Sequence, residues 1–353
     1  MAERGGARLR AFVTAPLRGP GFEALQRLAD VVYEPWLEYT PVRLYDPPRL
    51  AQRLAEVGAD LLICEADFCS GEVMELPLRA IVATRGEPSN VDVAAATAAG
   101  IPVLYTPGRN ADAVAELTVA LLFAVNRRLV PADRAVRTGR IFTETLPYQR
   151  YRSDLLAGQT FGIVGLGAVG RAVRRRMEGL GLGVIAHDPH VGEARHSLED
   201  LLATADIVSM HAPPSAETAH MMSAPQFAAM RPGAVYLNTA RAVLHDLDAL
   251  VAALESGHLG GCGLDHFDGE QLPEGHPLCG RDDVVLTPHI GGASTADDGA
   301  EGVGPRRFGG DRRGLRARRG GRRTAIGGWR RVESRSPRQQ PRDGAQAGLR
   351  ERR

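Results

Sequence analysis

Residues 165–170 read Gly-Leu-Gly-Ala-Val-Gly, and this pattern constrains the fold more than any other part of the chain. It follows the apolar run Phe161–Val164 and opens the helical pattern Ala168–Leu180. A strand, a glycine turn and a helix in this order form a dinucleotide-binding unit, because the helix begins with free N–H groups that can face phosphates. The same residues could also make a tight turn without a ligand. The context of strand and helix favours the nucleotide site.

Asp188 stands 18 residues after Gly170, beyond the next expected strand at Val184–Ala186. A carboxylate at this place can accept hydrogen bonds from the adenine ribose hydroxyls, and it repels a 2′-phosphate. The sequence therefore favours NAD over NADP. Taken alone, Asp188 followed by proline would also fit a surface turn.

Short apolar runs alternate with helical patterns on both sides of a long apolar helix expected at Ala111–Arg128. This alternation predicts parallel sheets covered on both faces. The expected helices of the first half are Pro48–Val57 and Val91–Ala99. The expected strands are Leu9–Thr14, Val31–Glu34, Leu61–Cys64, Ile81–Ala83, Val103–Tyr105, Phe161–Val164, Val184–Ala186, Ile207–Met210, Val235–Leu237, Gly263–Leu264 and Val284–Leu286.

Three candidate chemical residues follow three consecutive expected strands. Arg241 follows Val235–Leu237, Glu270 follows the strand that ends at Leu264, and His289 follows the last strand. The carboxyl ends of parallel strands meet at one edge of a sheet, so these side chains should share one crevice. Each could instead be a solvated or structural residue, and it is their conjunction that points to a site.

The chain resembles the D-isomer-specific 2-hydroxyacid dehydrogenases over about residues 8–298, including the D-3-phosphoglycerate dehydrogenase type. The resemblance rests on Pro107–Asn110, His211-Ala-Pro213 with Thr218, and the blocks Asn238–Arg241, Asp265–Glu270 and Thr287–Ser294. It implies an α/β protein with a doubly wound Rossmann NAD domain and a smaller flavodoxin-like substrate domain. The expected limits are 1–108 for the substrate domain and 109–293 for the NAD domain.

The resemblance also implies roles for the residues. Arg241 would bind the substrate carboxylate and polarise its carbonyl, His289 would exchange a proton with that oxygen, and Glu270 would orient His289 and favour its imidazolium form. Further substrate contacts are expected from Gly86, Glu87 and Asn110. The expected NAD contacts are Gly165, Gly167, Ala168, Val169, Gly170, Asp188, His211, Pro213, Thr218, Thr239, Ala240, Asp265 and Gly291.

The implied activity interconverts a small D-2-hydroxy acid and its 2-keto acid by hydride transfer with NAD. An NAD(H)-responsive binding protein of the corepressor type, without significant turnover, is the alternative, because this fold also serves recognition. The expected protein is a cytoplasmic homodimer with no metal site, no membrane span and no specific nucleic-acid partner. Four cysteines without a CxxC pair and a start without a signal-peptide pattern fit that location.

Several positions depart from the family pattern. Ala242 replaces the usual glycine after the arginine, which would cost strain if its φ were positive. In the loop 85–92, Pro88 offers no N–H to a substrate carboxylate, and Glu87 adds a negative charge unless it points to solvent. His266 replaces an apolar residue and is expected to be structural.

The last part of the chain changes character. Residues 301–353 hold 17 Arg against five acids, although the whole chain has a net charge of only +1. Residues 294–353 are therefore predicted to be an aberrant, disordered tail rich in Arg and Gly, in place of a helix that returns to the first domain. A frameshift near residues 298–304 would explain the change and would impair turnover.

Overall fold

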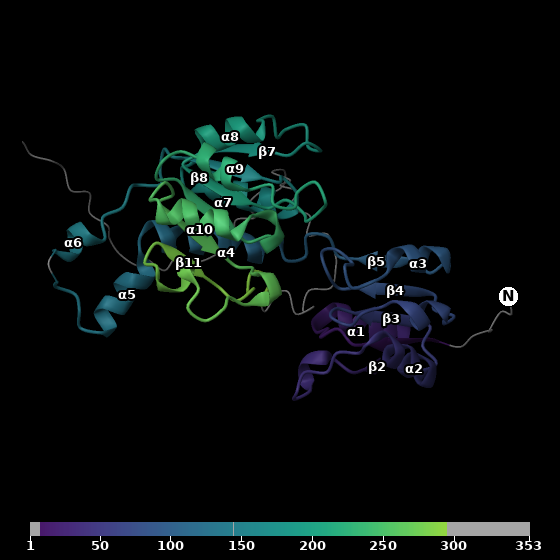
Figure 1. The fold of residues 1–353 in the computed structure, drawn as a ribbon. Helices are drawn as coiled ribbons and strands as arrows, with labels where there is room; N and C mark the ends of the chain where they lie inside the picture. The colour runs from purple at the N-terminus through teal and green to yellow at the C-terminus, as the bar shows by residue number, and fades with distance from the viewer. Residues whose placement is uncertain (1–7, 144, 295–353) are drawn as a thin grey trace, which may run out of the picture. The chain divides into compact units, whose positions relative to one another are not determined.

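The computed structural model describes residues 8–143 and 145–294, and the predicted tail beyond residue 294 lies outside this range. Two parallel sheets form its framework (Figure 1). The first region contains β1 (Leu9–Val13), α1 (Gly19–Leu28), β2 (Ala29–Tyr33), η1 (Trp36–Glu38), α2 (Pro47–Val57), β3 (Leu61–Cys64), η2 (Gly71–Glu75), β4 (Ala80–Ala83), α3 (Val93–Ala98) and β5 (Val103–Tyr105).

The first sheet has the order β2-β1-β3-β4-β5, with every neighbouring pair parallel. Its strands are apolar on both faces because helices cover both. Phe12 and Leu62 pack with α2 through Leu50 on one face, whereas Ala11 and Val13 pack on the other face, toward α1. This strand order is that of flavodoxin-like folds, as predicted.

The second sheet has the order β11-β10-β9-β8-β6-β7 and is also parallel throughout. Its elements are α4 (Ala111–Asn126), α5 (Leu129–Arg137), α6 (Pro147–Arg150), β6 (Thr160–Val164), α7 (Ala168–Gly179), β7 (Gly183–His187), α8 (Leu198–Thr204), β8 (Ile207–Met210), α9 (Ala224–Ala229), β9 (Val235–Asn238), η3 (Ala242–Leu244), α10 (Leu247–Glu255), β10 (Gly261–Leu264), η4 (Asp268–Glu270), η5 (Pro277–Gly280) and β11 (Val284–Leu286).

Two apolar cores flank this second sheet. Phe161, Ile163 and Leu237 pack with helices α4 and α7, whereas Val208 and Tyr236 pack on the opposite face with α8, α9 and α10. The doubly wound architecture predicted from the alternating pattern is therefore confirmed. None of the described helices is both long enough and apolar enough to cross a membrane.

The topology of the second sheet places a crevice beside β6. The chain moves outward to β7 and then returns past β6 to β8, so the connections that leave β6 and β8 diverge at their carboxyl ends. Ligands of doubly wound sheets bind at such a switch point. Gly165 follows β6 and His211 follows β8, which puts two predicted contact residues there.

Candidate active site

A pocket of about 760 Å³ lies at the carboxyl ends of the strands and is lined by loops from both sheet regions. Most residues predicted to touch cofactor or substrate lie in its wall. They are Gly86, Glu87, Asn110, Gly167, Ala168, Val169, His211, Pro213, Thr239, Ala240, Arg241, Asp265, His289 and Gly291.

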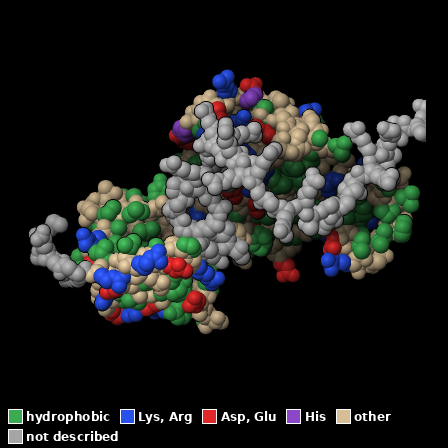
Figure 2. Space-filling view, turned by 180° about the vertical axis from the view of Figure 1, so that it is seen from behind, with side chains coloured by type: hydrophobic (Ala, Val, Ile, Leu, Met, Phe, Trp, Pro, Cys, Tyr) green, Lys and Arg blue, Asp and Glu red, His purple; other side chains and the backbone are tan. Residues whose placement is uncertain are grey.

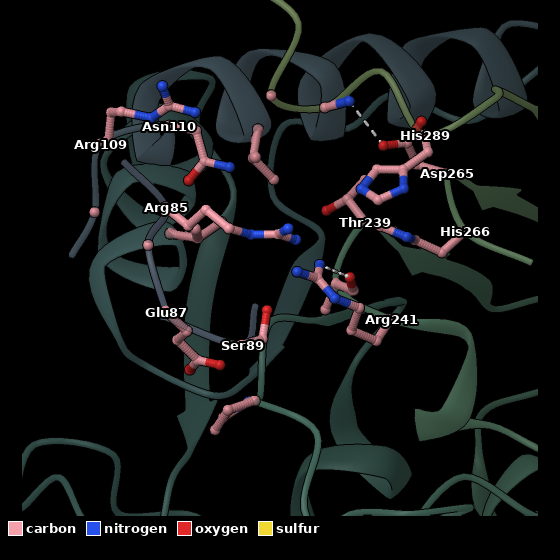
Figure 3. A pocket seen from close by; sticks show the side chains of 18 of the residues that line it. Arg85, Glu87, Ser89, Arg109, Asn110, Thr239, Arg241, Asp265, His266 and His289 are labelled. Atoms are coloured by element: carbon pink, nitrogen blue, oxygen red, sulfur yellow. Dashed lines mark hydrogen bonds between the residues drawn. The ribbon is translucent and has the colours of Figure 1, made fainter. Parts of the chain in front are cut away.

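Arg241 follows β9 and extends into the pocket (Figure 3). Its Nη1 donates a hydrogen bond of 2.6 Å to the Ala240 carbonyl oxygen, and no described acid lies within ion-pair distance of it. Burial lowers the pKa of Arg241, and repulsion from Arg85 lowers it further, while Glu87 and Glu270 act in the opposite direction. The guanidinium remains charged, and it has no carboxylate partner of its own. An anionic ligand would supply the missing partner.

His289 is paired with Glu270. Its Nδ1 lies 2.9 Å from Oε1 and 3.0 Å from Oε2 of this carboxylate. Both residues have positive φ, 54° for His289 and 61° for Glu270, a conformation that side chains other than glycine adopt rarely. The backbone thus holds the pair in a strained geometry. When Nδ1 carries a proton and donates it to Glu270, Nε2 is the nitrogen left to exchange a proton with a ligand.

Asp265 ties the histidine loop to the end of β10. Its Oδ1 accepts hydrogen bonds from Thr287 Oγ1 at 2.6 Å and from the Ile290 N–H at 2.9 Å, and its Oδ2 accepts one from the Gly291 N–H at 2.8 Å. The carboxylate is fully buried. Asp265 therefore fixes the backbone that carries His289 while it also lines the pocket.

His266 occupies the wall directly beside His289. The two ring centroids are 3.8 Å apart with the planes tilted by 56°, and Figure 3 shows both side chains on the same side of the pocket. Burial lowers the pKa of His266 to about 3, and the charges of His289 and Arg241 add to this effect. His266 is therefore a neutral imidazole at physiological pH.

The glycine loop fits the diphosphate of a dinucleotide. Gly165 has φ of +95°, and a Cβ there would meet the Ala212 backbone nitrogen at 2.4 Å, whereas a Cβ at Gly167 would meet open space. A Cβ at Gly170 would lie 2.2 Å from the Gly165 carbonyl oxygen. The first and third glycines thus permit close packing, and the middle one faces the space that phosphates would need. The N–H groups at the start of α7 have no intrahelical partner.

Two polar groups near this loop also fit a cofactor. The carboxylate of Asp188 accepts hydrogen bonds from the Leu166 N–H at 2.8 Å and from the His190 N–H at 2.9 Å, so it is held against the glycine loop. His211 lines the pocket, and its buried Nδ1 has no hydrogen-bond partner among the described residues. Burial lowers the pKa of His211 to about 3.

Five predicted residues do not line the pocket. Gly165 and Gly170 act through packing, and Asp188 lies at the end of β7. Thr218 is half-buried and bonds within its own turn, where its Oγ1 donates to the Pro213 carbonyl oxygen at 2.7 Å. Glu270 reaches the site through His289.

The pocket also contains residues that the sequence reasoning missed. Arg85 follows β4 and extends toward Arg241 (Figure 3), and neither guanidinium has a described acid within ion-pair distance. Arg109 pairs with Glu65 at 2.8 Å. Arg85 stands in the loop already singled out for its departure from the family, so its charge was a usable signal. Other lining residues without a role predicted from the sequence include Trp36, Ser89 and Ala293.

Three positions at which the sequence departs from the family pattern, Ala242, Glu87 and Pro88, have limited structural consequences. Ala242 begins η3 and is not among the described non-glycine residues with positive φ, so the strain considered for it does not arise. Glu87 is exposed, and its carboxylate points away from His289 in Figure 3. Pro88 leaves the loop without one N–H donor, but Arg85 adds a guanidinium nearby.

Comparison with known proteins agrees with this geometry. Residues 119–291 match the family model described as D-isomer specific 2-hydroxyacid dehydrogenase, NAD binding domain. A glyoxylate reductase of Thermofilum pendens is 36% identical over 301 residues, which cover 82% of this chain and 86% of that protein. A D-3-phosphoglycerate dehydrogenase of Mycobacterium tuberculosis is 39% identical over 268 residues, 72% of this chain but 49% of that protein.

Solved structures show the same relationship. The crystal structure of the TT0316 protein from Thermus thermophilus superposes with a TM-score of 0.71 at 37% identity, covering 82% of this chain and 92% of that one. The class is therefore that of two-domain NAD-binding α/β oxidoreductases. The chain belongs to the D-isomer-specific 2-hydroxyacid dehydrogenase family. It is an NAD-dependent enzyme acting on CH–OH donors, and the corepressor-type alternative is not supported.

Proposed function

We propose that the chain reduces a small 2-keto acid to the D-2-hydroxy acid, and performs the reverse reaction, with Arg241, Glu270 and His289 as its chemical set. The observation that carries this proposal is the His289–Glu270 pair in the same pocket as the acid-free guanidinium of Arg241. Bound NAD supplies or accepts the hydride. The similarity to glyoxylate reductases favours a short 2-keto acid as substrate.

Arg241 binds the substrate carboxylate and donates to the carbonyl oxygen. A guanidinium suits this task because it presents several N–H donors in one plane. Arg85 adds a second positive charge near Arg241, so the pocket attracts the anionic end of the acid. Gly86, Glu87 and Asn110 complete the substrate side of the proposed site.

His289 gives a proton to the carbonyl oxygen during reduction and accepts it during oxidation. Glu270 acts through His289: it fixes the orientation of the ring and stabilises the positive charge of the imidazolium. The strained backbone at both residues keeps the pair in place before the substrate arrives.

The cofactor side consists of the glycine loop and the neighbouring strand ends. Gly165, Gly167, Ala168, Val169 and Gly170 would hold the diphosphate, and Asp188 would bind the adenine ribose and disfavour NADP. Asp265 would contact the carboxamide end of the nicotinamide. The other predicted cofactor contacts are His211, Pro213, Thr239, Ala240 and Gly291 in the pocket wall, and Thr218 outside it.

We propose, finally, that the enzyme is a cytoplasmic homodimer. Large exposed apolar side chains gather on α5, on α6 and on the chain beside them, including Phe142, Tyr148 and Leu155. An exposed apolar surface of this kind is typical of a protein–protein interface.

Turnover with a panel of 2-keto acids tests the proposed function. Oxidation of NADH would be followed at saturating cofactor with glyoxylate, hydroxypyruvate, pyruvate and phenylglyoxylate. We expect turnover of at least one of these acids and its loss in Arg241→Gln. Binding of NADH without turnover of any acid would contradict the proposal.

A further inference from the structure

The imidazole of His266 is a largely buried polar group without a partner. The residue is only 5% exposed, yet neither ring nitrogen makes a hydrogen bond with any described residue. His266 lines the pocket, and its ring nitrogens are not among the described side-chain atoms that are both buried and unpartnered, so they are open to a ligand from the pocket. The sequence reasoning expected a structural role for His266, but a structural role does not require an imidazole here, since a phenyl ring would pack against His289 equally well.

The neighbours of His266 are good metal ligands. His266, Glu270 and His289 each offer one donor atom, and these three atoms all lie within 4.8 Å of one another. His266 is buried at the end of β10, and the other two residues are fixed by backbone with positive φ. His266 is thus fixed by burial, while the exposed side chains of Glu270 and His289 can rotate toward a shared ion.

We propose that His266, Glu270 and His289 bind one divalent transition-metal ion of the zinc class. Two imidazoles and one carboxylate form a donor set typical of zinc sites with one open position, and they also suit Co²⁺ and Ni²⁺. Zinc–nitrogen bonds of about 2.0–2.1 Å require donor atoms closer together than 4.8 Å, so the site closes slightly around the ion. Mg²⁺ and Ca²⁺ are disfavoured because they prefer oxygen ligands.

The bound ion acts as an inhibitor, a consequence that rests on the proposed function. A metal shared by His289 and Glu270 replaces the contact of 2.9 Å between Nδ1 and the carboxylate, so it removes the partner of the imidazolium, and its positive charge opposes protonation of the ring. Two of its ligands, His266 and His289, line the pocket where the keto acid would bind. The metal should therefore reduce turnover, and a chelator should restore it. This departs from the expectation of a protein without a metal site.

Titration of the metal-free chain, residues 1–353, with Co²⁺ tests the site directly. Co²⁺ held by two imidazoles and a carboxylate in a tetrahedral site absorbs visible light far more strongly than hexaaqua Co²⁺ and at longer wavelength, and Zn²⁺ should displace it. We expect one equivalent to bind. His266→Phe keeps a ring against His289 but removes a ligand, and should weaken binding by about 100-fold or more. His196→Phe, at an exposed histidine outside the pocket, should bind as the unmodified chain does.

A second variant and a second readout keep the test decisive. Glu270→Ala should also weaken Co²⁺ binding, and retained NADH binding shows that each variant is folded. Equal Co²⁺ affinity in His266→Phe and the unmodified chain, or no stoichiometric complex at all, would overturn the proposal. Inhibition by Zn²⁺ is expressed as the ratio of turnover with and without Zn²⁺ for each protein, because the variants differ in their turnover without metal. Co²⁺ binding that depends on His266 in a chain that turns over no keto acid would uphold the metal site and reject the proposed function instead.

Discussion

His289 depends on Glu270 more than on any other described residue. The imidazole and the carboxylate are held together by two contacts of 2.9 and 3.0 Å and by strained backbone on both sides. The Glu270 carboxylate influences the proton transfer only through the His289 ring that it orients. The effects of substitutions at the two residues on kcat/KM should therefore not be additive in free energy.

A double-mutant cycle measures this dependence. His289→Gln should lower kcat by about 10²–10⁴-fold, the usual contribution of a general acid–base group. Glu270→Gln should cost less, and the double variant should lose no more than His289→Gln alone. The measurement is kcat/KM for the four proteins, with NADH binding as the control for folding. Losses that multiply would show that Glu270 has a separate role.

Asp188 should set the cofactor preference. Its charge would repel the 2′-phosphate of NADPH, and Asp188→Ala should narrow the preference for NADH by about tenfold or more. The same carboxylate also holds the Leu166 N–H, so Asp188→Asn, which keeps an acceptor without the charge, separates the two effects. Both Kd values would come from fluorescence titration. NADPH binding as tight as NADH in the unmodified chain would refute the assignment.

The sequence predicts those site residues whose chemical type suits the reaction and whose position follows the end of an expected strand. Arg241, Glu270 and His289 follow strand ends, and strand ends can be recognised from apolar runs. It could not find the contact between the His266 and His289 rings, because their positions are 23 residues apart and their contact depends on the path of the loop after β11. Arg85 was missed for a similar reason, since its direction is set by the turn after β4.

At the scale of elements, the strands were the most predictable. Strands covered on both faces need continuous apolar residues, which the sequence shows directly. Helices with little buried surface were not predicted: α1 has no buried residue, and α6 is a single turn. The start of α3 was placed two residues early, because Asp92 caps this helix by accepting the Ala95 N–H at 2.9 Å.

Two glycines of α7 provide a matched test of the cofactor loop. Gly170→Ala should lower the free energy of unfolding by about 1–3 kcal/mol and weaken NADH binding, because its Cβ would lie 2.2 Å from the Gly165 carbonyl oxygen. Gly179→Ala meets no atom within 4 Å and should stabilise the helix by roughly 0.5–1 kcal/mol. Urea unfolding and NADH titration check both. Equal effects of the two substitutions would contradict the packing role of Gly170.

His245 should make the second sheet region sensitive to acid. It is buried between β9 and α10, its Nδ1 lies 2.9 Å from Asn238 Nδ2, and burial lowers its pKa to about 4. Above about pH 6.5 both folded and unfolded states are neutral at this ring. Below it only the unfolded state takes up the proton, so stability falls between about pH 6.5 and 4, by up to about 3 kcal/mol.

The test compares urea unfolding at pH 7.5 and pH 5. His245→Asn keeps an amide acceptor for Asn238 and cannot titrate, so its stability should change less between the two values than that of the unmodified chain. His196→Asn, at an exposed histidine, is the control. An undiminished pH dependence in His245→Asn would assign the acid sensitivity to other groups.

At the scale of the whole molecule, the described side chains visible on the face shown in Figure 2 are a mixture of acidic, basic and apolar types. The region from α5 to the start of β6 differs. Figure 1 shows α5 and α6 standing away from the six-stranded sheet, and Phe142 and Leu155 are 77% and 81% exposed. Apolar side chains on a projecting segment gain from burial only if another surface covers them. A second copy of the chain is the proposed partner.

Phe142→Asp combined with Leu155→Asp should dissociate this dimer. Burying one side chain of this size contributes about 1.5–3 kcal/mol, so the double variant should raise the dimer Kd by far more than tenfold. Leu28→Asp on α1 is the matched control, since its side chain is 76% exposed but lies in the first sheet region. Light scattering should give twice the chain mass for the unmodified protein and for Leu28→Asp, and one chain mass for the double variant.

A dimer that persists with both aspartates would place the interface elsewhere, and an unmodified chain that is monomeric would refute the proposed dimer. Phe142 and Leu155 are not among the residues that line the pocket, so the separated protomers should retain NADH binding, which distinguishes loss of assembly from loss of fold.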